Sequence, residues 1–111
     1  MARFPKYVLK RSTNQQFVWV LYAVNGEVIL SSETYVTKQS AANGIASSKR
    51  SVTDSNFLRK TATTQQPYFL QVAINAEPLG RSEMYNSLQA RENGIGAVKR
   101  DAPIAEIEDI T

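Results

Sequence analysis

The 111-residue chain contains no cysteine and no histidine. Without cysteine it forms no disulfide, offers no thiolate nucleophile and cannot hold zinc through sulfur ligands. Without histidine it lacks the side chain that most often acts as a general base near neutral pH, and also the commonest neutral metal ligand. An enzyme built on this chain would need carboxylates, lysine, tyrosine or a bound cofactor. We therefore expect a non-enzymatic protein with no cofactor and no metal.

Long apolar runs are also missing. The longest run, Phe17 to Val24, is far below the roughly 20 residues that a membrane-spanning helix needs, and no stretch of signal-peptide length follows Met1. With 42% hydrophobic residues, a chain of 111 residues can bury one compact core but is too short for two independent ones. We expect a single domain over residues 1–111, soluble and cytoplasmic, with no membrane contact.

The main positive feature of the chain is an internal repeat. When the sequence is shifted by 50 positions it matches itself without a gap, with 14 identities in the 36 positions of 15–50 and 65–100. Chance similarity is a poor explanation of such a match. The domain is therefore expected to contain two pseudo-symmetric repeats, at about 4–55 and 56–111. The matching motifs are Asn25-x-Glu27 with Asn75-x-Glu77, Ser32-Glu33-x-Tyr35 with Ser82-Glu83-x-Tyr85, and Asn43-Gly44-Ile45 with Asn93-Gly94-Ile95.

Each repeat begins with short stretches rich in β-branched and aromatic residues. In the first repeat, residues 7–10, 17–24 and 27–32 are predicted strands, and Asn25-Gly26 favours a type I′ hairpin turn. Asn75-Ala76 suits positive φ less well. Pro78 enters the next strand and predicts that this strand lies at a sheet edge or is irregular, because proline cannot donate to the ladder.

The hydrophobic period becomes helical after each repeated tyrosine. Thr37 and Ser87 are the expected N-caps of helices that run to Arg50 and Arg100. The strand near 56–63 ends the first repeat and opens the second, and residues 104–110 close the set. The predicted fold is α+β: the order β-β-β-α, β-β-β-α, β forms one antiparallel sheet with both helices on one face.

These residues resemble a known family. Asn25-Gly26-Glu27, Ser32-Glu33-x-Tyr35 and the duplicated Asn43-Gly44-Ile45 are similar to the repeat of YegP-like proteins, small bacterial proteins of unknown function. The resemblance covers nearly the whole chain. It implies tandem β-β-β-α-β repeats that form one sheet and exchange their terminal strands. It also implies that the duplicated form is a monomer, because single-repeat relatives would pair as dimers. No activity follows from it.

The long strands carry the main functional clue, because both of their faces are apolar. If Phe17, Trp19, Leu21 and Ala23 face the helices, the alternate residues point away from them. A sheet covered on one side normally shows polar residues on the other. Curvature, terminal strands or a homodimer would cover this second face in one interpretation, and a protein partner or apolar ligand in the other. The candidate interaction face comprises Val18, Val20, Tyr22, Val24, Tyr68, Leu70, Val72 and Ile74.

Gly44 and Gly94 fall in the middle of the predicted helices, where each costs about 1 kcal/mol relative to alanine. We favour a packing reason, in which the helix closely approaches the sheet or the other helix, while Asn43 and Asn93 make local hydrogen bonds. The alternative is a pocket across the pseudo-twofold axis, in which the two asparagine amides contact a ligand.

Charge supports two further hypotheses. Residues 1–50 carry seven basic and two acidic residues, which favours weak nucleic-acid binding as an alternative function. No nucleic-acid-binding motif accompanies this charge, and the helix dipole explains the basic pairs at the helix ends. A carboxylate-based enzyme is the third possibility, if equivalent acids meet in one cleft. The basic residues are Arg3, Lys6, Lys10, Arg11, Lys49, Arg50, Lys99 and Arg100, and the acid pairs are Glu27 with Glu77 and Glu33 with Glu83.

Overall fold

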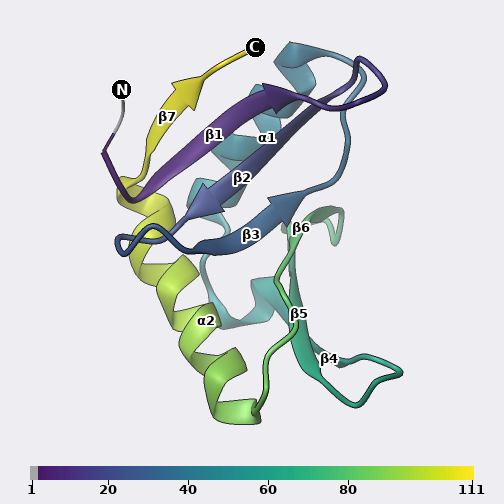
Figure 1. Cartoon of the computed structure of the whole chain (residues 1–111), viewed down its shortest axis with the longest axis vertical. Coiled ribbons are helices and arrows are strands. Elements are labelled where there is room, and N and C mark those ends of the chain that lie inside the picture. The colour runs from purple at the N-terminus through teal and green to yellow at the C-terminus, as the bar shows by residue number, and fades with distance from the viewer. Residues whose placement is uncertain (1–2) are drawn as a thin grey trace.

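The computed structural model describes residues 3–111, which form one seven-stranded sheet and two α-helices (Figure 1). The predicted α+β fold is confirmed. The strands are β1 (Lys6–Arg11), β2 (Phe17–Tyr22), β3 (Val28–Ser32), β4 (Phe57–Thr61), β5 (Pro67–Val72), β6 (Pro78–Arg81) and β7 (Glu106–Asp109). The helices are α1 (Lys38–Arg50) and α2 (Leu88–Asp101), followed by the 3₁₀ turns η1 (Asp54–Asn56) and η2 (Ala102–Ile104).

The strand order β4-β5-β6-β3-β2-β1-β7 shows how the two repeats share the sheet. β3 and β6 meet in the middle, where Ser31 lies opposite Arg81 and Ser32 opposite Gly80. β4 follows the helix of the first repeat but pairs with β5 of the second, and β7 follows α2 but lies beside β1. The predicted exchange of terminal strands is therefore confirmed.

One strand differs in direction from the prediction. β7 runs parallel to β1, with Ile107 opposite Tyr7, so the sheet is mixed rather than wholly antiparallel. The turn η2 delivers the chain from α2 to the end of the sheet where β1 begins, and the Glu106 N–H donates to the Pro5 carbonyl at 3.2 Å. Because both strands start at the same end, they run in the same direction.

Pro78 does not lie in an edge strand, because β6 is central in the sheet. It is the first residue of β6, a position where proline is tolerated. The register between β5 and β6 shifts at that end, but the β2–β3 hairpin, which has no proline, shows the equivalent shift between Leu21 and Tyr22, so Pro78 is not its cause. The predicted type I′ turn is wrong, because a type I′ turn needs positive φ at both central residues. In the turn between β2 and β3 only Gly26 has positive φ, of 84°, and in the turn between β5 and β6 only Ala76 does, of 69°.

Both helices begin where the sequence predicts. The side-chain oxygens of Thr37 and Ser87 accept the backbone N–H of Ser40 and Ala90, each at 3.0 Å. These bonds satisfy donors that the first turn of a helix leaves unpaired. α1 packs against β1, β2 and β6, and α2 packs against β5 and β3. Each helix therefore bridges the two repeats, and both cover the same face of the sheet (Figure 1).

The core lies between the sheet and the helices. In β2, Phe17, Trp19 and Leu21 are buried while the alternate residues are only half-buried, which confirms the predicted helix-facing set. The ring of Trp19 meets Tyr7 edge-on at a centroid distance of 5.2 Å. Burying a side chain of this size contributes on the order of 2–3 kcal/mol to folding.

Candidate functional site

The helix-free face of the sheet is defined by the strand register, because residues directly opposite each other in antiparallel strands share a face. We call this surface the sheet face. Five of the eight residues predicted for it lie there, half-buried: Val18, Val20, Tyr22, Tyr68 and Leu70. Across the strands, one row of this face contains Val8, Val20, Ser31, Arg81, Leu70 and Leu58.

The other three predicted residues lie elsewhere. Val24 and Ile74 occupy the hairpin turns beyond the strands, where they are 60% and 100% exposed. Val72 is the equivalent of Tyr22, and both follow a register shift, but Val72 is only 7% exposed and offers little surface to a partner. The strict alternation that the sequence suggests ends where β2 and β5 end, because bulges and turns break the two-residue period.

The sheet face also carries cations that the sequence prediction did not place there. Lys10 lies opposite Val18, Lys60 lies opposite Tyr68, and the guanidinium of Arg81 sits over the Tyr68 ring, 5.5 Å from its centroid. Within residues 3–111, none of these three cations forms an ion pair. The recurrence of lysine at the same strand position in both repeats is the signal that could have revealed them.

Two grooves lie between the helix of one repeat and the β-hairpin of the other. The α1 groove has a volume of about 740 Å³ and the α2 groove about 290 Å³. Equivalent residues of the two repeats line them, so the pseudo-twofold axis relates the grooves. The shared lining is Tyr35, Asn43, Gly44, Arg50, Asn75 and Glu77 in the α1 groove, and Tyr85, Asn93, Gly94, Arg100, Asn25 and Glu27 in the α2 groove.

The helix glycines allow a tyrosine to pass beneath each helix. A Cβ at Gly44 would lie 2.7 Å from Cζ of Tyr35 and closer still to its hydroxyl, and a Cβ at Gly94 would meet Tyr85 in the same way, again 2.7 Å from Cζ. Non-bonded carbon atoms do not approach so closely. The glycines therefore have a packing role, although the close neighbour is a tyrosine rather than the sheet or the other helix.

The repeated asparagines make the local hydrogen bonds that the sequence predicts. Gln39 donates to Oδ1 of Asn43 at 3.0 Å, and Gln89 donates to Oδ1 of Asn93 at 2.9 Å. Each amide nitrogen is left over for other contacts. Because the two asparagines line separate grooves, they do not meet in one pocket across the pseudo-twofold axis.

The tyrosine hydroxyls of the grooves are weaker acids than usual. Burial raises the pKa of Tyr35, the nearby indole N–H of Trp19 opposes this rise, and Glu33 and Glu77 add to it. The pKa of Tyr85 rises for the same main reason. Both hydroxyls are therefore neutral near pH 7 and act as hydrogen-bonding groups rather than as bases.

The carboxylates predicted to pair do not meet. Glu77 lines the α1 groove, whereas Glu27 lines the α2 groove together with Glu83, and Glu33 lines neither groove. A glycosidase-like mechanism requires two carboxyl groups on either side of one cleft. The predicted pairs, Glu27 with Glu77 and Glu33 with Glu83, are therefore not assembled, although Glu27 and Glu83 share the α2 groove. Residues 3–111 also contain no group of three or more acidic side chains able to hold a metal ion.

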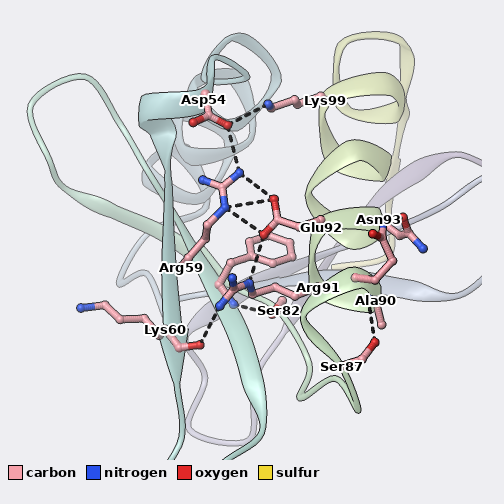
Figure 2. Close-up of polar contacts among 12 residues, drawn as sticks. Asp54, Arg59, Lys60, Ser82, Ser87, Ala90, Arg91, Glu92, Asn93 and Lys99 are labelled. Carbon is pink, nitrogen blue, oxygen red and sulfur yellow. Dashed lines mark hydrogen bonds and ion pairs between the residues drawn. The ribbon is translucent and has the colours of Figure 1, made fainter.

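Several of the basic residues predicted to contact nucleic acid are engaged within the protein. Figure 2 shows Lys99 in a network with Asp54, Arg59 and Glu92, in which Asp54 accepts from both cations. Such contacts leave no continuous basic surface of the kind that phosphate binding needs. The other contacts are Lys6 with Glu108 at 2.9 Å, Lys49 with the Ala105 carbonyl at 2.7 Å, and Arg100 with Asp101 at 2.7 Å.

None of the helices that the structure describes is long and apolar enough to cross a membrane.

Comparison with known proteins identifies the family. A family model described as a domain of unknown function, DUF1508, matches residues 12–57 and 62–109, one match for each repeat. The chain belongs to this family. It is similar to the UPF0339 protein SO3888 of Shewanella oneidensis, whose solution NMR structure matches with a TM-score of 0.90 and 41% identity, over 96% of this chain and 91% of that chain.

Other relatives agree, and the predicted resemblance to YegP-like proteins is confirmed. The solution NMR structure of Escherichia coli yegP, described as a protein of unknown function, matches with a TM-score of 0.90 and 39% identity, over 100% of this chain and 95% of that chain. Alignment with the curated YegP of Yersinia pestis is shorter, with 56% identity over 41 residues. That alignment spans 37% of each protein, and the one with the curated Shewanella relative also spans 37% of each.

Proposed function

We propose that this DUF1508 protein is a non-enzymatic interaction module that binds a protein partner through the sheet face. The supporting observation is that both repeats place apolar side chains on the sheet face, away from the two helices. Val18 and Val20 of the first repeat and Leu70 of the second are half-buried there, and Ser31 and Arg81 lie between them. Exposed apolar side chains rimmed by polar residues often mark an interaction site.

The charge of the sheet face indicates the chemistry of the partner. Lys10, Lys60 and Arg81 stand among the apolar side chains and have no carboxylate partner of their own. A complementary surface would combine apolar side chains with aspartate or glutamate. Complementary charges of this type steer association and suppress wrong partners.

Single-stranded nucleic acid is the competing occupant, because it also favours aromatic rings beside cations. Stacking needs ring faces that a base can reach. Arg81 already lies over Tyr68, and the ring of Phe4 packs on Tyr22 at a centroid distance of 5.8 Å. These contacts favour a protein partner over a nucleic acid, and the experiment below separates the two.

The first test is capture from nuclease-treated lysate by the wild-type protein and by the Val20→Lys/Leu70→Lys variant. The matched control is Val36→Lys/Leu88→Lys, which adds the same charge at exposed apolar positions outside the sheet face, 77% and 62% exposed. We expect the sheet-face variant alone to lose the partner. Retention of the same proteins by all three baits would overturn the proposal.

A second measurement establishes that binding is direct and depends on charge. The captured protein, purified, is titrated against the wild type and the Lys10→Glu/Lys60→Glu variant by calorimetry. We expect charge reversal to weaken binding by about tenfold or more, with a steep salt dependence in the wild type. Capture that disappears on nuclease treatment would instead assign the face to nucleic acid. Self-association abolished by Val20→Lys/Leu70→Lys would assign it to a second copy of the chain.

A further inference from the structure

The two grooves differ at the last arginine of each helix. In the α2 groove, Nε and Nη2 of Arg100 donate to the two carboxylate oxygens of Asp101 at 2.7 and 3.0 Å. The same carboxylate accepts the backbone N–H of Val24 at 3.3 Å, and its side chain is 2% exposed. A buried carboxylate is thus held between the arginine of a helix and the amide of the facing hairpin.

The α1 groove has the equivalent donors but no carboxylate at the position of Asp101, and Glu77, the acidic residue that lines it, forms no ion pair with Arg50. Arg50 stands in the position of Arg100, Ile74 in that of Val24, and Ser51 in that of Asp101. Within residues 3–111, Arg50 forms no ion pair and the Ile74 N–H donates to no acceptor. Arg50, Ser51 and Ile74 all line the α1 groove.

We propose that the α1 groove binds a small carboxylate ligand, whose carboxyl group lies between the Arg50 guanidinium and the Ile74 amide. The second repeat supplies the template, since the side chain of Asp101 places a carboxylate between Arg100 and the Val24 amide. Arginine pairs in bidentate fashion with carboxylate and with phosphate, and the Asp101 template favours the carboxylate. The inference is independent of the proposed function, because the groove and the sheet face are different surfaces.

The walls of the groove indicate the rest of the ligand. Ser40, Asn43 and Ser47 follow one another at helical spacing and lead along α1 to Arg50, and all of them line the groove. The Asn43 amide nitrogen is available to donate, because the bond with Gln39 uses only its oxygen. These donors face apolar side chains, so the ligand should carry hydrogen-bond acceptors on one side and an apolar group on the other. The facing apolar residues are Ile74, Pro78 and Leu79.

The second repeat lacks this set of donors. Ala90 and Ala97 replace the two serines in the α2 groove, which is also the smaller groove, at about 290 Å³ against about 740 Å³. Sites for small molecules commonly have volumes of several hundred cubic ångströms and a few convergent polar groups. The α1 groove alone therefore combines the space, the donors and the arginine that a carboxylate ligand requires.

The test follows the Ile74 amide by NMR while N-acetylglycine is added to the ¹⁵N-labelled protein. We expect a saturable shift of this resonance with the acid and none with its uncharged methyl ester. Arg50→Gln should weaken binding by about tenfold or more, because it removes the bidentate pair. Arg81→Gln, which removes an unpaired arginine from the other face, should leave the affinity unchanged.

A second variant keeps the test decisive if N-acetylglycine binds weakly. Ser51→Asp supplies the carboxylate within the chain, so it should shift the free Ile74 resonance and abolish the response to N-acetylglycine. Three results would overturn the proposal: no saturable shift in the wild type, equal weakening by Arg50→Gln and Arg81→Gln, or tighter binding of inorganic phosphate than of the carboxylate. The last result would assign the groove to a phosphate ligand.

Discussion

The two repeats share strands, helix and turns, but their halves of the core differ in polarity. In one half, the Tyr7 hydroxyl lies 2.8 Å from Oγ of Ser48, which donates to Oε1 of Gln71 at 2.7 Å. All three side chains are fully buried. The equivalent positions of the other half hold only apolar side chains, Phe57, Val98 and Leu21.

The difference indicates that the buried residues that share a hydrogen-bond network are replaced together: all three are polar in one half of the core and all three are apolar in the other. The Gln71 amide also donates to the carbonyls of Ser48 and Ser51, at 3.0 and 2.9 Å, so no hydrogen-bonding group of its side chain is left without a partner. A partly satisfied polar network is worse than an apolar core, because each unpaired group keeps its desolvation cost. Symmetry is therefore kept by the backbone and not by individual side chains.

The sheet ends in β4 on one side and in β7 on the other, and no strand within residues 3–111 covers the outer edge of either. Arg59 of β4 forms a bidentate pair with Glu92, in which Nε and Nη2 each donate at 2.9 Å, and it reaches Asp54 (Figure 2). β7 carries acidic side chains instead, Glu106, Glu108 and Asp109. Charged side chains deter other strands from pairing with an open edge. The two edges are therefore both charged, but through different residues.

The largest expected effect tests the feature that the repeats share. Gly44→Ala and Gly94→Ala should each destabilise the fold by about 2–3 kcal/mol, because the new methyl group must displace a packed tyrosine. Gly96→Ala is the matched control, since nothing lies within 4 Å of its Cβ position. That change should stabilise α2 by up to about 1 kcal/mol. Urea unfolding measures all three, and equal tolerance at Gly44 and Gly96 would contradict the packing role.

The polar half of the core is tested by making it resemble the other half. Gln71→Leu alone should cost about 2 kcal/mol, because it leaves the Ser48 hydroxyl and two backbone carbonyls with unmet hydrogen bonds. The triple change Tyr7→Phe/Ser48→Val/Gln71→Leu should recover the part of that loss that comes from the Ser48 hydroxyl, because it removes that group. Chemical denaturation gives the free energy of unfolding for both variants. If the triple variant were less stable than Gln71→Leu alone, the inference that these three residues are replaced together would be wrong.

The buried carboxylate of the second repeat makes stability depend on pH. Arg100 holds the pKa of Asp101 below its ordinary value, and burial only partly opposes this. Because the folded-state pKa is lowered, the carboxylate stabilises the fold above about pH 4, and this contribution is lost as the pH falls through the folded-state pKa. Asp101→Asn should remove about 1.5 kcal/mol near neutral pH and flatten the acid limb of the profile.

Thermal unfolding followed between about pH 2 and pH 7 measures that profile. Ser51→Asn at the equivalent position is the control and should leave the acid limb as it is in the wild type. An unchanged acid limb in Asp101→Asn would show that the pair with Arg100 does not stabilise the fold.

The smallest expected effect concerns the hairpin turns. Ala76 has a φ of 69° where the first repeat has Gly26. An alanine in this region is strained, so Ala76→Gly should stabilise the protein by about 0.5–1 kcal/mol, and Gly26→Ala should destabilise it by a similar amount. Differential scanning calorimetry resolves both shifts. Two changes of the same sign would mean that the turns are not equivalent.

Much of the fold could be predicted from the sequence because its signals are local. Alternating apolar residues marked β2, and Thr37 and Ser87 marked the helix starts through bonds to residues only three positions away. The 50-residue repeat then predicted the shared strand near 56–63, and the resemblance to YegP-like proteins implied the strand exchange. The direction of β7 could not be predicted, because it depends on where η2 places the chain relative to β1.

The candidate sites were harder to predict because each joins distant parts of the chain. The alternation of Val18 and Val20 located the sheet face, but the burial of Val72 leaves no clear sequence signal. Arg50 and Ile74 lie 24 positions apart in different repeats, and their amide and guanidinium come together only when α1 packs against the opposite hairpin.

The sequence by itself determined the repeat, the amphipathic strands and helices, and the helix glycines, since these follow from side-chain periodicity and local backbone preference. Tertiary structure alone decided that a tyrosine packs beneath each helix glycine, which cations lack an ionic partner, and that the α1 groove is larger than the α2 groove. Those features depend on contacts between the repeats, which exist because each helix packs against strands of the other repeat.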